Sequence, residues 1–219
     1  MQNKQQIVVI GLGVFGETIA RELTRLGHDV LGIDSDEHVV DRLSESITHA
    51  VIADVTDEQV IEELNIGDYD VAVLAIGRNF EATILATMHL QNIGIRKIWA
   101  KALTAQHQKI LQRLRVNRVI APEYEMGVRI AQELNYPHVQ NYIGLGDGDY
   151  VVEIEAGEAL DGLAMETLLE QTGASISALV IKRNTSIHHC PGRAFQIKKG
   201  DHLVLGGRLD EFRKIESYL

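Results

Sequence analysis

A glycine-rich turn near the amino terminus constrains the fold more than any other feature of this sequence. The stretch IVVIGLGVFGETIA places four β-favouring residues before Gly11, Gly13 and Gly16, and a helical pattern after them. The first glycine permits a tight turn, the second permits a pyrophosphate to approach the backbone, and the third permits the helix to pack closely on the sheet. This pattern predicts a nucleotide-binding turn between a strand and a helix.

The helix that follows the turn is expected to begin near Val14 and Phe15. The amino terminus of a helix carries unpaired N–H groups and the positive end of the helix dipole, and both attract phosphate groups. We therefore include Val14 and Phe15, with the three glycines, in the predicted nucleotide site.

Six short β-rich runs alternate with helical stretches through the first 135 residues. The runs cover residues 7–10, 30–33, 50–53, 71–75, 97–100 and 119–120. The helical stretches cover residues 17–26, 37–45, 57–64, 82–91, 105–114 and 123–134. Apolar strands that are each followed by an amphipathic helix predict a parallel sheet covered on both faces. Right-handed crossovers make this a doubly wound, Rossmann-like α/β domain.

The pattern changes after a predicted hinge at Asn135-Tyr136-Pro137, where proline restricts the residue before it. Strands are expected over residues 149–155, 178–182 and 202–205, with a helix over 164–171 and a turn at 183–184. Strands grouped around one or two helices predict a small α+β module. The predicted organisation is therefore two domains, residues 1–135 and 136–219.

Composition narrows the function classes. A net charge of −10 and a pI near 5.3 disfavour broad nucleic-acid binding, which normally needs a basic patch. The one cysteine, Cys190, excludes an intramolecular disulfide and fits a reducing cytoplasm. The polar start MQNKQQ does not resemble a signal peptide, and the longest apolar runs are too short to span a bilayer. Any role in transport would then require a separate membrane partner.

Asp34 is the strongest candidate for recognising the sugar of a nucleotide. It ends the second predicted strand, 18 residues after the last glycine of the turn. A carboxylate at this position accepts hydrogen bonds from ribose hydroxyls and repels a 2′-phosphate, so NADP is disfavoured. The alternative is that Asp34, or one of its neighbours Ser35 and Asp36, only caps the next helix.

Other polar residues follow later strands and are expected at the same edge of the sheet, where parallel strands present their carboxyl ends. Asp54 is placed to accept from an adenine amino group, or else to cap a helix. Lys101 is placed to offset phosphate charge, or else lies on a solvated surface. The remaining candidates come after the fourth strand and are Gly77, Arg78 and Asn79.

Groups for catalysis are scarce. A Tyr-x-x-x-Lys pair and a Gly-x-Ser-x-Gly elbow are both absent from the sequence. His188-His189-Cys190 offers zinc ligands, but adjacent residues of an extended chain point in opposite directions. We therefore predict a protein that is not an enzyme, with a small NAD-dependent oxidoreductase as the alternative.

Several blocks together resemble the RCK domains that regulate potassium channels and transporters. They are VVIGLGVFGETIARELTRLGHDVLGID, HAVIADVTDE, AIGRNFEAT, IWAKA and PEYEMGVRIAQEL, and in the carboxyl-terminal part Ile197-x-x-Gly200-Asp201-x-Leu203. One copy of the two-domain unit resembles the regulatory subunits of bacterial potassium uptake systems of the KtrA/TrkA family. The resemblance implies an RCK N-terminal nucleotide-binding domain followed by a small α+β RCK C-terminal domain.

The resemblance also implies how such a subunit works. It implies a homo-octameric ring, bound to a membrane subunit of the KtrB or TrkH type at the cytoplasmic face of the membrane. Exchange of ATP and ADP in the N-terminal domains would change the shape of the ring. Glu123 would lie near the nucleotides at a dimer interface and help to hold Mg²⁺ or another cation; the alternative is an ordinary acid in the first turn of a helix.

One position departs from the family pattern. Similar sequences commonly carry arginine where this chain has Val14, and that arginine reaches a terminal phosphate. A charge-assisted contact worth about 1.5–3 kcal/mol is therefore missing. Arg78 is a candidate substitute, and NAD or NADH becomes the alternative to ATP and ADP. The resemblance leaves open whether cyclic di-AMP binds the C-terminal domain.

Overall fold

The computed structural model describes residues 4–135 and 139–218. It divides into two compact units, Met1–Met126 and Gly127–Leu219, and the division falls inside helix α6 (Pro122–Asn135). The boundary predicted between residues 135 and 136 lies where this helix ends, and it stays a proposal. The predicted hinge includes residues 136 and 137, which lie outside the described part of the chain.

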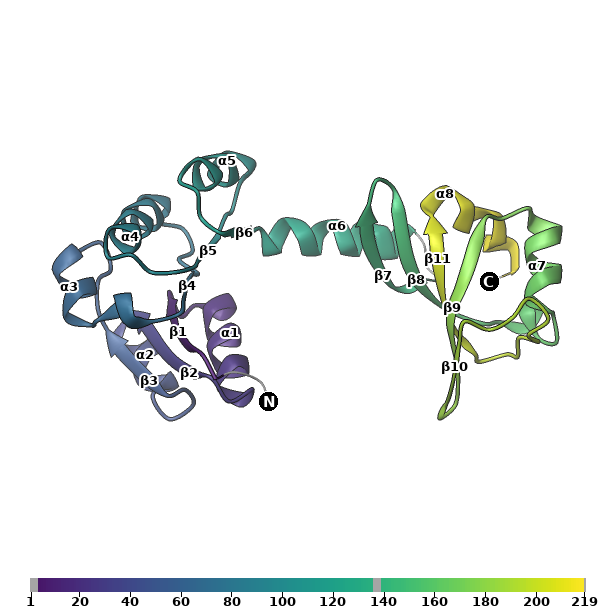
Figure 1. The fold of residues 1–219 in the computed structure, drawn as a ribbon, viewed down its shortest axis with the longest axis horizontal. Helices are drawn as coiled ribbons and strands as arrows, with labels where there is room; N and C mark the ends of the chain where they lie inside the picture. Colours follow the sequence, from purple (N-terminus) through teal and green to yellow (C-terminus); the bar gives the residue numbers. More distant parts are fainter. Residues whose placement is uncertain (1–3, 136–138, 219) are drawn as a thin grey trace. The chain divides into compact units, whose positions relative to one another are not determined.

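The first unit contains a six-stranded parallel sheet in the order β3-β2-β1-β4-β5-β6 (Figure 1). This order places the first strand at the centre and confirms the predicted doubly wound α/β fold. The strands are β1 (Gln6–Ile10), β2 (Asp29–Asp34), β3 (His49–Ile52), β4 (Val71–Leu74), β5 (Ile98–Lys101) and β6 (Arg118–Ile120).

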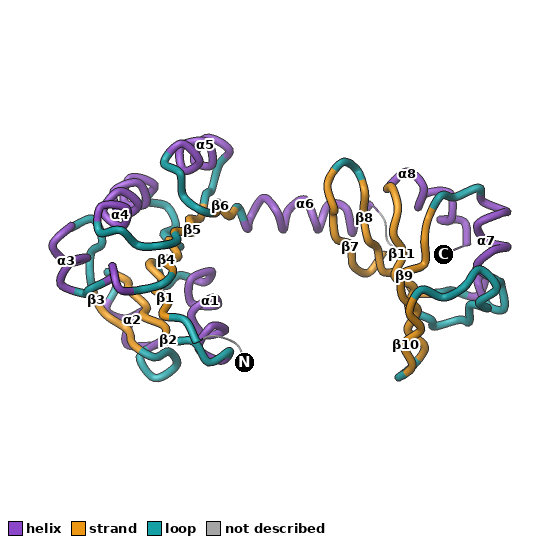
Figure 2. Tube along the Cα trace, in the orientation of Figure 1, coloured by secondary structure: helices purple, strands orange, loops and turns teal. Residues whose placement is uncertain are grey.

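Helices connect these strands, as the sequence pattern predicts (Figure 2). They are α1 (Val14–Arg25), α2 (Glu37–Leu43), α3 (Glu58–Glu63), η1 (Ile66–Asp68), α4 (Phe80–Asn92) and α5 (Ala105–Arg113). Helix α1 begins at Val14, directly after Gly13, as the sequence predicts. Strand β5 ends one residue later than predicted and includes Lys101 as its last residue.

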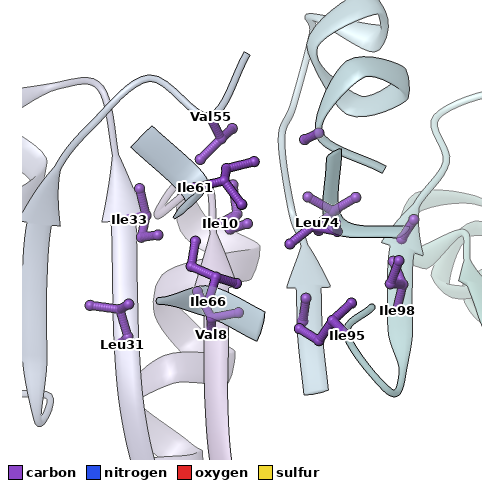
Figure 3. Packing of buried hydrophobic residues seen from close by; sticks show 14 of the residues in the cluster. Val8, Ile10, Leu31, Ile33, Val55, Ile61, Ile66, Leu74, Ile95 and Ile98 are labelled. Atoms are coloured by element: carbon purple, nitrogen blue, oxygen red, sulfur yellow. The ribbon is translucent and has the colours of Figure 1, made fainter. Parts of the chain in front are cut away.

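Alternate residues of the central strand point to opposite faces of the sheet, and both faces are covered. Val8 and Ile10 pack in a core with residues of α3, α4 and α5, whereas Ile7 and Val9 pack in a second core with residues of α1 and α2. Figure 3 shows Val8 and Ile10 in the first of these cores. A parallel sheet buried on both faces explains why its strands read as continuous apolar runs.

The second unit is built on an antiparallel sheet in the order β10-β9-β11-β8-β7. Its helices pack on a separate apolar core, which confirms the α+β module. The strands are β7 (Val139–Gly146), β8 (Asp149–Glu155), β9 (Ile176–Arg183), β10 (Ser186–His189) and β11 (His202–Arg208). The helices are η2 (Glu158–Leu160), α7 (Met165–Thr172), α8 (Leu209–Phe212) and η3 (Arg213–Tyr218).

One buried charge is held by this second sheet. The carboxylate of Asp201 is 1% exposed and accepts two hydrogen bonds from the Arg183 guanidinium, at 2.8 and 2.7 Å. The N–H of Lys198 donates a third at 2.8 Å. Burial raises the pKa of the Asp201 carboxyl, but these donors outweigh burial and hold the pKa below its usual value.

None of the helices in the described part of the chain is long and apolar enough to cross a bilayer. This agrees with the short apolar runs seen in the sequence.

Candidate functional site

The three glycines of the turn lie in three different environments. Gly11 has φ = 89°, and a Cβ on it would lie 2.9 Å from the carbonyl carbon of Ala75. A Cβ on Gly16 would lie 1.8 Å from the carbonyl oxygen of Gly11, so α1 packs directly on the turn. A Cβ on Gly13 would meet nothing within 4 Å. Two glycines therefore permit tight packing, and the middle one borders open space.

Helix α1 starts at this open space. Gly13 is the residue before the helix, and it offers no side chain to accept a hydrogen bond from the first N–H groups. Val14 is 88% exposed in this chain. The start of α1 therefore has the features of an anion-binding helix terminus, without a charged side chain at residue 14.

Asp34 is the residue that joins the ends of the first two strands. Its Oδ2 accepts a hydrogen bond from the N–H of Leu12 at 2.6 Å, and its Oδ1 accepts one from the N–H of Asp36 at 3.0 Å. The cap of α2 is Asp36, whose side chain accepts from the N–H of His38. Asp34 is thus not the helix cap; it holds the glycine-rich turn, and its role toward a ribose stays a proposal.

We expect Asp34→Ala to lower the free energy of unfolding by about 2 kcal/mol, because two backbone N–H groups lose a charged acceptor. Urea unfolding followed by the fluorescence of Trp99, the one tryptophan, measures this in the first unit. Asp36→Ala is the matched control: it removes a helix cap, costs about 1 kcal/mol and leaves the turn intact. Equal stability of Asp34→Ala and the parent chain would contradict this role.

Lys101 and Glu123 form an ion pair beside the start of α1. Lys101 ends β5, Glu123 lies in the first turn of α6, and their Nζ and Oε1 atoms are 2.5 Å apart. The same ammonium lies 5.4 Å from the centroid of the Phe15 ring. The hydrogen bond from Lys101 lowers the pKa of the Glu123 carboxyl. The structure therefore brings together three predicted residues from distant parts of the sequence.

The remaining predicted residues lie at the same edge of the sheet but have local partners or are exposed. Asp54 accepts from the N–H of Thr56 at 2.9 Å and from its hydroxyl at 2.7 Å, which lowers the pKa of the Asp54 carboxyl. Asn79 caps α4 by accepting from the N–H of Ala82. Gly77 and Arg78 are exposed. Their contact with a nucleotide stays a proposal.

One aromatic pair near this edge was not predicted from the sequence. Phe80 directly follows the loop of residues 77–79, and its ring stacks in parallel on the ring of His107, with centroids 3.6 Å apart. The two residues are far apart in the sequence and belong to no shared motif, so only the fold reveals the contact. Across the described residues, no group of three or more His, Cys, Asp or Glu side chains is arranged to hold a metal ion.

Comparison with known proteins shows which family the chain belongs to. The model of the TrkA-N domain family matches residues 7–122, just over half of the chain. The parallel sheet and the glycine-rich turn define a Rossmann-like nucleotide-binding class, and the family match shows that the chain belongs to the TrkA-N domain family. It is 37% identical to Ktr system potassium uptake protein A of Bacillus subtilis, over 99% of this chain and 97% of that protein. It is 32% identical to Ktr system potassium uptake protein C of the same organism, over 98% and 97%.

A solved structure matches the chain over both units. The GsuK channel bound to NAD matches with a TM-score of 0.63 and 15% identity, over 99% of this chain and 40% of the channel chain. This likeness establishes the fold. The resemblance to RCK regulatory subunits of potassium uptake systems is thus confirmed at the level of family and fold.

Proposed function

We propose that this chain is a regulatory subunit that binds an adenine nucleotide and gates a potassium-translocating partner in the membrane. The observation that carries the proposal is the similarity, over almost the whole chain, to potassium uptake proteins of the Ktr system. In this role the protein reads the nucleotide and performs no chemistry on it. A membrane partner of the KtrB or TrkH type would supply the ion pathway, with this chain at the cytoplasmic face.

The nucleotide site of this proposal lies at the carboxyl ends of the strands of the parallel sheet. Gly11, Gly13, Val14, Phe15 and Gly16 receive the phosphates, Asp34 receives the ribose hydroxyls, and Lys101 neutralises phosphate charge. Asp54, Gly77, Arg78, Asn79 and Glu123 complete the rim. Support comes from the open space at Gly13 and from the ammonium of Lys101 beside the start of α1.

The choice between nucleotides depends on residue 14. An exposed valine cannot make the charged contact to a terminal phosphate that an arginine makes. We propose ATP and ADP as the ligands, with NAD or NADH as the alternative; a solved relative in fold, GsuK, has been seen with NAD bound. Glu123 is the proposed ligand for Mg²⁺ or another cation, at an interface between copies of a homo-octameric ring.

A thermal-shift titration with ATP, ADP, NAD and NADH, each with and without Mg²⁺, tests the proposal. A ligand that binds only the folded chain adds about 2.7 kcal/mol of stability at a hundred times its Kd, which is readily seen. Gly13→Val is the control variant, because its side chain enters the open space that the phosphates need. The proposal fails if all four nucleotides leave the unfolding temperature unchanged, and turnover of NADH would favour an oxidoreductase instead.

A further inference from the structure

We propose that Glu123 is a built-in competitor for the ligand's phosphates: its carboxylate occupies the Lys101 ammonium, and an anionic nucleotide must displace it in order to bind. This inference rests on the proposed nucleotide site and adds its regulation: Glu123 pairs with Lys101 before nucleotide binds, and only the displaced carboxylate is free for the cation role proposed above. When the phosphate of a ligand pairs with Lys101, Glu123 loses its ion pair, and the first turn of α6 is held less tightly.

The position of the ammonium is the first support. Lys101 ends β5, the strand between β4 and the edge strand β6, and its Nζ lies over the ring of Phe15 in the first turn of α1. In sheets of this kind, phosphates bind where the strand ends meet the start of that helix. The ammonium is therefore at the place where a phosphate oxygen would be recognised, and within one chain a carboxylate already neutralises it.

The unequal burial of the two partners is the second support. The Lys101 side chain is 10% exposed, whereas the Glu123 side chain is 58% exposed. A charge removed from water needs a partner, so Lys101 cannot simply lose its anion. Glu123 can turn into water at little cost. The pair is thus built for exchange of one anion for another, with the lysine fixed and the glutamate free to leave.

The location of Glu123 means that loss of its ion pair affects helix α6. It lies in the first turn of α6, the helix inside which the two units of the chain divide. None of the side chains described in α6 is buried. In the first turn, the hydrogen bonds that tie the helix to the first unit include the Lys101 pair and a 3.3 Å contact from the N–H of Ala121 to Glu125. Loss of the Lys101 pair therefore weakens the attachment of α6.

Calorimetric titration of the full chain with ADP and with NAD, in EDTA, tests the competition. Both ligands carry a pyrophosphate. Glu123→Gln keeps the size of the side chain and removes its charge. We therefore expect this variant to bind the nucleotides about threefold more tightly than the parent chain, because a half-exposed ion pair contributes only a small free energy. Glu125→Gln is the matched control in the same helical turn and is expected to leave affinity unchanged. Lys101→Gln is expected to weaken binding.

Each outcome separates this inference from the proposed function. If the parent chain binds and Glu123→Gln binds no more tightly, the competition is refuted while the nucleotide site stands. If neither binds ADP or NAD, both ideas fail. Hydrogen exchange gives an independent readout: nucleotide should speed exchange in the first turn of α6 in the parent chain and leave it unchanged in Glu123→Gln. Slower exchange in the parent chain would overturn the inference.

Discussion

Replacing Gly16 with alanine is expected to lower the free energy of unfolding of the first unit by about 3 kcal/mol, because the new methyl group has no room. Its Cβ would lie 1.8 Å from the carbonyl oxygen of Gly11, and that atom belongs to backbone. Relief requires α1 to move away from the turn, which opens the core beneath Ala20. Urea unfolding followed by Trp99 fluorescence measures the loss, since Trp99 lies in β5 of this unit.

Gly13→Ala is the matched control for this prediction. A Cβ at residue 13 meets nothing within 4 Å, and its φ of −63° suits any residue. The cost is expected to stay below about 1 kcal/mol, the difference between glycine and alanine before a helix. If both variants lost the same stability, close packing of α1 on the turn would not be the reason for glycine at residue 16.

Replacing Arg183 with leucine is expected to cost the second unit about 3 kcal/mol. The change leaves the Asp201 carboxylate buried without its main partner, and an uncompensated buried charge is among the most destabilising defects known. The one tryptophan lies in the first unit, so hydrogen exchange of amides in β9 and β11 is the appropriate measurement. Arg208→Leu is the control: it breaks an exposed pair with Asp210 and should cost under about 1 kcal/mol.

Acid gives a second test of the same pair. Because the pKa of Asp201 is lowered in the folded chain, the contribution of the pair is fully present above the unfolded value of about 3.9. It is lost as the pH falls below that value and through the folded pKa. Below about pH 4 the parent chain should therefore lose more stability than Arg183→Leu. A constant difference between the two chains across this range would argue against an ionised Asp201.

The fold was largely predictable because its signals are local. Continuous apolar runs, helical periodicity and the spacing of Gly11, Gly13 and Gly16 each act over a few residues, and they led to the observed sheet of the first unit. Strands β7 and β10 were not predicted. β10 is a short, exposed arm that pairs only with β9, and β7 is an edge strand whose exposed face carries Ile143, so neither shows clean alternation.

The site was predictable as a set of strand ends but not as a set of contacts. Topology alone brings Asp34 and Lys101 to one edge. The sequence contains no sign that Asp34 would hold the N–H of Leu12, that Asn79 would cap α4, or that Glu123 would meet Lys101. Such contacts depend on side-chain directions that are set by the packing of whole helices and strands. Asp34 and Leu12, for example, are 22 residues apart in the sequence.

The bond between Asp34 and Leu12 has a consequence for how such a protein can evolve. A substitution at Asp34 that admitted a ribose 2′-phosphate would also take away the acceptor that shapes the glycine-rich turn. If Asp34 receives the ribose, as proposed above, one side chain sets both the sugar preference and the geometry of the turn. A change in nucleotide preference through Asp34 would then also require changes in the turn of residues 11–13, in evolution as in protein design.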